Sequence, residues 1–270
     1  METKWRLPCL LSALIAVLAA AASFGGLFFP GLYRDNALIT CAWRGNDFIT
    51  LAAAVPGLMV SMLLTVRGSK RAHLIWAGML GYMVYNYIFY LYGAAFNVFF
   101  LPYVLLFTLS IYALILTVAK LDVPAVHRQL SPRTPVRFIG GFMVFFAALL
   151  GAMWVAMSLS FVFTGIVPQP ILQTGHPTGV VFATDLSLLV PAMALGGVLL
   201  WKRRPIGYIL AAIVLIKACT YGLVMISMSV FTYHGLGTVD PFIPLWAFLS
   251  AGCIAACGLL FWNMKEKAKA

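Results

Sequence analysis

Charged residues are scarce in this 270-residue sequence, at 9% of the chain, whereas 63% of the residues are hydrophobic. Soluble domains carry about a quarter charged residues, so this composition excludes an ordinary soluble protein and indicates one that crosses a membrane several times. The net charge of +11 could suggest nucleic acid as a partner. Most lysines and arginines, however, stand in short segments beside apolar runs, a pattern typical of membrane topology, and nucleic acid is therefore excluded.

Residues that carry common catalytic chemistry are also few. The only glutamates are Glu2 and Glu266, near the two ends, and the four histidines fall in loops or at the ends of apolar runs: His73, His127, His176 and His234. A haem held by two histidines inside the bilayer, a His-Glu-x-x-His zinc site, a phosphate-binding Walker loop and an intramembrane Ser-His-Asp triad are all disfavoured. No metal, no cofactor and no catalytic residue is predicted, and whether the protein is an enzyme stays open.

Five cysteines offer little further chemistry. Only Cys41 lies in a predicted loop, so no pair outside the membrane is available for a disulfide. Cys253 and Cys257 are four residues apart and share a helix face. We interpret them as small residues that pack against a neighbouring helix, in preference to a metal or redox site.

Long apolar runs dominate the sequence. Eight of them are long enough to cross a bilayer as helices, at about 7–29, 48–66, 74–92, 98–119, 137–164, 180–200, 206–230 and 242–263. The sequence therefore predicts an all-α polytopic membrane helix bundle with eight transmembrane helices, whose main partner is the lipid bilayer. The first run also resembles a secretory signal peptide, but it continues through "GGLFF", which favours an uncleaved anchor.

Basic segments fall at alternate ends of these runs. Because lysine and arginine are retained on the cytoplasmic side, we expect both termini to be cytoplasmic, in a plasma or inner membrane. The loops at 30–47, 93–97, 165–179 and 231–241 would then face outward. The first of these loops carries Arg34, Asp35, Arg44 and Asp47, interpreted as a solvated loop with locally paired charges or, alternatively, as the charged mouth of an entry path.

The chain divides into two halves that look alike. A charged, proline-containing cytoplasmic linker at 120–136 separates a four-helix half at 1–119 from another at 137–270. Val55-Pro56 and Val190-Pro191 each stand at the same distance before a basic turn, eleven residues from proline to Arg67 or Lys202. An even number of spans in each half predicts a parallel 4+4 repeat about an axis along the membrane normal, with a site expected between the halves.

Two ionisable residues interrupt the apolar runs, Asp185 and Lys217. Such residues are costly in a membrane, and they are expected to face the bundle interior and each other. Their helices are joined by a tight turn, and the rise of about 1.5 Å per residue puts both at similar heights in the outer half. We therefore expect a direct or water-bridged ion pair.

Polar and aromatic residues of the third run are expected to join this pair. Tyr82, Tyr85 and Asn86 share a helical stripe there, and Tyr221 lies on the same face as Lys217. The six residues predict a ligand-binding cavity open to the outer side: Asp185, Lys217, Asn86, Tyr82, Tyr85 and Tyr221. Its phenol rings would suit an aromatic solute or, by cation-π attraction, an organic cation.

Three functions remain consistent with the sequence. The leading hypothesis is a small-solute carrier or ligand-binding, permease-like protein with an unknown small-molecule ligand. A second is a non-transporting subunit or sensor, whose polar network only fixes helix packing and which binds another copy of itself or a partner membrane subunit. The third is an intramembrane enzyme that acts on a lipid or quinone-like substrate.

Overall fold

The computed structural model describes residues 5–129 and 131–264, so Lys4, Glu2 and the basic and acidic residues beyond 264 lie outside the described residues. Eight helical segments within these ranges are long and apolar enough to cross a membrane, and the described residues form no strand. The predicted all-α bundle with eight spans is thus confirmed, and the chain has the structure of a multi-pass membrane protein.

Six of the spans are single helices: α1 (Arg6–Phe28), α4 (Lys70–Tyr92), α5 (Phe100–Ala119), α7 (Val136–Thr164), α11 (Pro205–Leu236) and α12 (Ile243–Trp262). The other two each contain one π-helical turn. The second span consists of α2 (Ala37–Ile49), η2 (Thr50–Ala54) and α3 (Val55–Val66), and the sixth consists of α9 (Val180–Thr184), η3 (Asp185–Leu189) and α10 (Val190–Trp201). Short helices α6 (Val123–Gln129) and α8 (Gln169–Thr174) lie in connections.

The second span begins eleven residues earlier than the sequence predicted, because α2 starts at Ala37. The Asn36 side chain caps the helix by accepting a hydrogen bond from the Ile39 N–H at 3.0 Å. Asn46 and Asp47, which we expected in an outer loop, therefore lie on a helix and are almost completely buried, with 0% and 2% exposed. Gly45 allows α2 to pack closely against α11, since a Cβ at this position would lie 2.6 Å from the Met228 backbone of α11.

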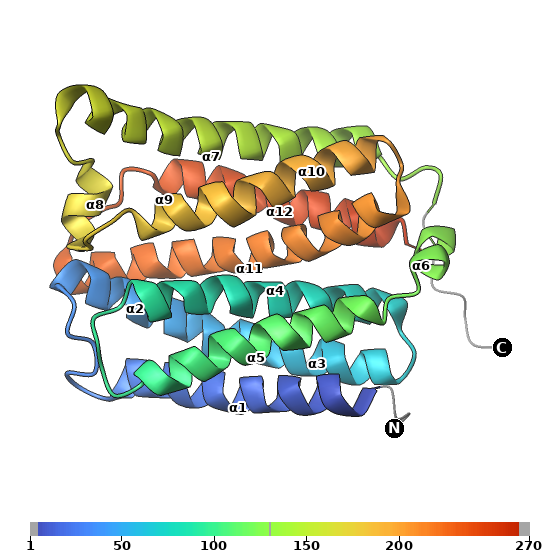
Figure 1. The fold of residues 1–270 in the computed structure, drawn as a ribbon, viewed down its shortest axis with the longest axis horizontal. Helices are drawn as coiled ribbons and strands as arrows, with labels where there is room; N and C mark the ends of the chain where they lie inside the picture. Colours follow the sequence, from blue (N-terminus) through green and yellow to red (C-terminus); the bar gives the residue numbers. More distant parts are fainter. Residues whose placement is uncertain (1–4, 130, 265–270) are drawn as a thin grey trace.

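The helices are arranged as two groups along a common axis (Figure 1). In one group α4 packs against α3 and α5, and α1 packs against α2, α3 and α5; in the other α11 packs against α10 and α12, and α7 packs against both α10 and α12. The groups meet where α11 packs along α2 and α4. The turns from α3 to α4 and from α10 to α11 lie at one end of the bundle with α6, and we call the opposite end, near α8, the distal end (Figure 1).

The two π-helical turns occupy matching positions. Each is followed directly by a Val-Pro pair, and the Val55 and Val190 N–H groups bond back to the carbonyls of Thr50 and Asp185 five residues earlier. Proline has no N–H and disturbs the carbonyls of the preceding turn, which explains a wider turn directly before it. The same breaks therefore recur 135 residues apart in the chain, together with the same lengths of α3 and α10.

Candidate functional site

Asp185 begins the π-helical turn of the sixth span, and the residue is 4% exposed. Two donors satisfy it: the Tyr85 hydroxyl from α4 bonds to Oδ1, and the Trp154 indole Nε1–H from α7 bonds to Oδ2 at 2.9 Å. The Trp154 ring is stacked on Phe182, with 4.2 Å between ring centres, which fixes its direction. Asp185 is therefore a buried, doubly hydrogen-bonded carboxylate held by three different spans.

Lys217, in the middle of α11, is 6% exposed. Its ammonium lies 3.0 Å from the centre of the Tyr85 ring and 4.9 Å from that of Tyr221, so the two rings provide cation-π attraction. Among the described residues, however, this nitrogen has no hydrogen-bond partner. The expected direct ion pair is thus not formed, because the Tyr85 phenol takes the place beside Asp185 with its hydroxyl and the place beside Lys217 with its ring.

A cavity of about 170 Å³ lies against these groups, and we call it the Lys217 cavity. Its polar and aromatic wall consists of Tyr85, Trp154, Asp185, Lys217, Tyr221, Trp246, Ser250 and Cys253, and its apolar wall includes Phe146, Leu150, Leu189, Met225, Met228 and Leu249. These residues come from α7, the sixth span, α11 and α12, and Tyr85 is the contribution of α4. The cavity therefore lies mostly inside the second helix group, whereas the sequence placed a site between the halves.

Four of the six predicted ligand residues meet at this cavity: Asp185, Lys217, Tyr85 and Tyr221. The other two lie apart, in a buried network of α2 and α4. The Tyr82 hydroxyl lies 2.8 Å from Thr50 Oγ1 and donates to Asn46 Oδ1 at 3.3 Å, while Asn46 Nδ2 donates to Asn86 Oδ1 at 2.8 Å. Neither Tyr82 nor Asn86 lines the Lys217 cavity.

This second network is the positional counterpart of the first. Thr50 opens the π-helical turn of the second span as Asp185 opens that of the sixth, and Tyr82 stands twelve residues after the start of α4, as Lys217 stands twelve residues after the start of α11. The counterpart pair is neutral and is joined by a direct hydrogen bond. In one helix group Thr50 and Tyr82 thus bond directly, whereas in the other Asp185 and Lys217 are not in direct contact and line a cavity.

A further buried carboxylate lies nearer the distal end. Asp47 of α2 accepts hydrogen bonds from the Tyr33 hydroxyl and, at 2.9 Å, from the Tyr90 hydroxyl. Burial raises the pKa of the Tyr33 phenol well above its usual range, so this donor keeps its proton. Sequence reasoning missed this cluster, although buried Ile39, Trp43 and Asp47 recur at helical spacing and could have revealed it.

The described residues contain no group of three or more histidines, cysteines or acids arranged to hold a metal ion. The chemistry of the Lys217 cavity is instead that of one ammonium with free N–H donors in a largely apolar, aromatic enclosure. Comparisons of the chain with protein-family models, with curated proteins and with solved structures found no match in any of the three.

Proposed function

We propose that this membrane protein binds a small solute in the Lys217 cavity and carries it across the bilayer. The observation that carries the proposal is the Lys217 ammonium, which is buried against a cavity and has no hydrogen-bond partner among the described residues. An unsatisfied buried charge costs several kcal/mol. A ligand that accepts hydrogen bonds from this ammonium would offset that cost, so the cavity would bind such a ligand in preference to others.

The surroundings of the ammonium indicate the class of solute. The faces of Tyr85 and Tyr221 are already engaged by Lys217, which disfavours the organic cation that the tyrosines alone suggested. Both oxygens of Asp185 already accept a hydrogen bond, from Tyr85 and from Trp154, and the Lys217 charge close to the Tyr85 ring would repel a second cation. An acceptor group on an apolar or aromatic body, such as a small monocarboxylate, fits the remaining donors and the apolar wall.

Carriage is supported by the spans that bear the polar residues. The second and sixth spans are both broken by a π-helical turn before a proline, and such broken helices border the sites of many transporters. The proposed parallel relation of the two helix groups, with a closed contact in one and an open cavity in the other, suits a mechanism in which the groups move relative to each other.

Thermal unfolding in detergent tests the binding step. The purified protein would be screened against a panel of monocarboxylates from acetate through octanoate to phenylacetate and benzoate. We expect at least one to raise the unfolding temperature of the wild type but not that of Lys217→Met. Lys202→Met removes the same charge from an exposed turn and serves as the matched control; it should respond as the wild type does.

A second step tests carriage. The carboxylate that binds would be supplied to proteoliposomes, and its accumulation compared between the wild type and Asp185→Asn, which we expect to bind or carry it at least tenfold less well. The proposal is wrong if no panel member stabilises the wild type, or if Lys217→Met is stabilised equally. Binding without accumulation would restrict the function to ligand binding.

A further inference from the structure

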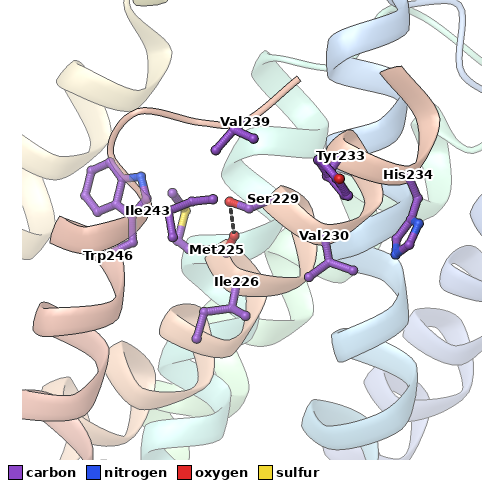
Figure 2. A pocket seen from close by; sticks show the side chains of 9 residues that line it. All are labelled: Met225, Ile226, Ser229, Val230, Tyr233, His234, Val239, Ile243 and Trp246. Atoms are coloured by element: carbon purple, nitrogen blue, oxygen red, sulfur yellow. Dashed lines mark hydrogen bonds between the residues drawn. The ribbon is translucent and has the colours of Figure 1, made fainter. Parts of the chain in front are cut away.

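A second hollow lies next to the Lys217 cavity, at the distal end between α11 and α12 (Figure 2). Its volume is about 240 Å³, and we call it the distal groove, lined by the nine residues drawn in Figure 2. Most of the wall is apolar and open, with Ile226, Val230 and Val239 at 44%, 47% and 65% exposed. Tyr233 and His234 add polar groups at the side remote from Trp246 (Figure 2).

The groove and the cavity share two wall residues, Met225 and Trp246. Both are half-buried, and Figure 2 shows them together with Ile243 at one side of the groove. The same two side chains line the cavity that contains Lys217. A rise of about 1.5 Å per residue places Met225 about 12 Å along α11 from Lys217. Met225 and Trp246 therefore form part of the boundary between the groove and the cavity.

Trp246 is held in place by a residue outside the span. Its indole Nε1–H donates to Asp240 Oδ2 at 3.0 Å, and the other oxygen of Asp240 accepts from the Phe242 N–H at 2.8 Å. Asp240 lies in the loop between α11 and α12, so the indole position depends on the loop. Met225 is an unbranched side chain that adapts readily to a changed volume. The boundary thus consists of the hydrogen-bonded Trp246 ring and the flexible Met225 side chain.

We propose that Trp246 and Met225 form a gate through which an amphipathic monocarboxylate passes from the distal groove into the Lys217 cavity. This inference rests on the proposed function for the identity of the solute. The apolar wall of the groove would contact the apolar body of the solute, and opening requires the Trp246 ring to leave Asp240. Carboxylate transfer to Lys217 then leaves the body among Phe146, Leu150 and Leu249.

Cys253 provides a reporter for the gate that needs no ligand. It lines the Lys217 cavity, is 1% exposed and lies seven residues after Trp246 on α12, on the same helix face. A protein in which Cys9, Cys41, Cys219 and Cys257 are replaced by alanine would retain this single thiol. Its rate of alkylation by N-ethylmaleimide in detergent then measures entry into the cavity.

Two variants should open the gate. Trp246→Ala removes the ring, and we expect at least tenfold faster alkylation of Cys253. Asp240→Ala removes the acceptor of the Trp246 indole from a half-buried loop residue outside the span, and it should give a smaller increase. Adding Val230→Trp to Trp246→Ala fills the groove and should return the rate toward that of the single-cysteine protein, because the route then starts from a blocked entrance.

Leu249→Ala is the matched control, since Leu249 lines the cavity but not the groove. Unchanged rates in both Trp246→Ala and Asp240→Ala would overturn the gate, as would an equal acceleration in Leu249→Ala, which would indicate general loosening. If no carboxylate binds but Cys253 is alkylated faster in the two variants, the proposed function and its solute are wrong while the gate stands. Failure of the Cys253 response alone would remove only the gate.

Discussion

The Lys217 ammonium lies on the face of the Tyr85 ring, 3.0 Å from its centre, while the hydroxyl of the same phenol donates to Asp185. One side chain thereby contacts both charges of a buried pair and keeps them from meeting directly. Cation-π attraction is worth about 2 kcal/mol when desolvated, so it holds the ammonium without using its N–H groups. The N–H groups of Lys217 are therefore not used in a salt bridge with Asp185.

The first prediction concerns the coupling of the two charges. Asp185→Asn and Lys217→Met each leave an uncompensated buried charge, and each should lower the free energy of unfolding by about 3 kcal/mol or more. The double variant removes both charges. Its free energy of unfolding should therefore be about 0.5–3 kcal/mol higher than the value expected from adding the two single losses. Equilibrium unfolding of the four proteins in mixed micelles measures this; strict additivity would mean that the charges do not interact.

The second prediction is that the hydroxyl and the ring of Tyr85 each contribute to stability. Tyr85→Phe keeps the ring under Lys217 but removes the donor to Asp185, and we expect a loss of about 1.5–3 kcal/mol in unfolding free energy, the usual worth of a hydrogen bond to a charged group. Tyr85→Leu also removes the ring face and should cost more. Tyr112→Phe, at a residue that is 60% exposed, is the control and should change stability by less than about 0.5 kcal/mol. Equal losses in Tyr85→Phe and Tyr85→Leu would show that the ring contact is unimportant.

The eight spans could be predicted because each crossing needs a long apolar run, and such runs are hard to miss. The start of the second span at Ala37 was missed because its first turns contain Arg44, Asn46 and Asp47, which reduce the hydropathy of the window. Asn46 and Asp47 are tolerated because Asn86 and two tyrosine hydroxyls bond to them inside the bundle. Hydropathy measures the average cost of a segment and does not register such partners.

The site was predicted in part for a similar reason. Asp185 and Lys217 stand out because charges within spans are rare, and sequence alone suffices to select them. Tyr82 and Tyr85 share a broad stripe of α4, yet one contacts Thr50 and the other contacts Asp185. Which neighbour each faces depends on how α2, α9 and α11 pack around α4, and one helix's periodicity does not contain that information. Trp154 had no distinguishing signal within its apolar run.

The Tyr82 network should be dispensable for binding. Tyr82→Phe breaks the neutral contacts with Thr50 and Asn46, and we expect a stability loss of about 1 kcal/mol. Because Tyr82 does not line the Lys217 cavity, the carboxylate that stabilises the wild type should raise the unfolding temperature of this variant by the same amount. If Tyr82→Phe folds but its unfolding temperature no longer rises with the carboxylate, Tyr82 takes part in ligand binding after all.

The last prediction uses His176, in the loop between α8 and α9. Burial lowers its pKa from the usual 6.5, against the opposing charge of Asp35, and its Nε2 atom is buried without a hydrogen-bond partner among the described residues. A histidine with a lowered folded-state pKa binds a proton less readily in the folded protein than in the unfolded chain. The fold is therefore fully favoured above about pH 6.5 and loses stability as the pH falls below that value.

His176→Gln removes this titrating group while keeping a polar side chain of similar length. Unfolding temperatures measured between pH 8 and pH 5 should fall more steeply for the wild type than for the variant below about pH 6.5, and the two curves should run parallel above it. Since every other group is common to both proteins, the difference curve isolates His176. Parallel curves over the whole range would mean that its burial does not disfavour the proton, and a steeper fall in the variant would reverse the sign of the effect.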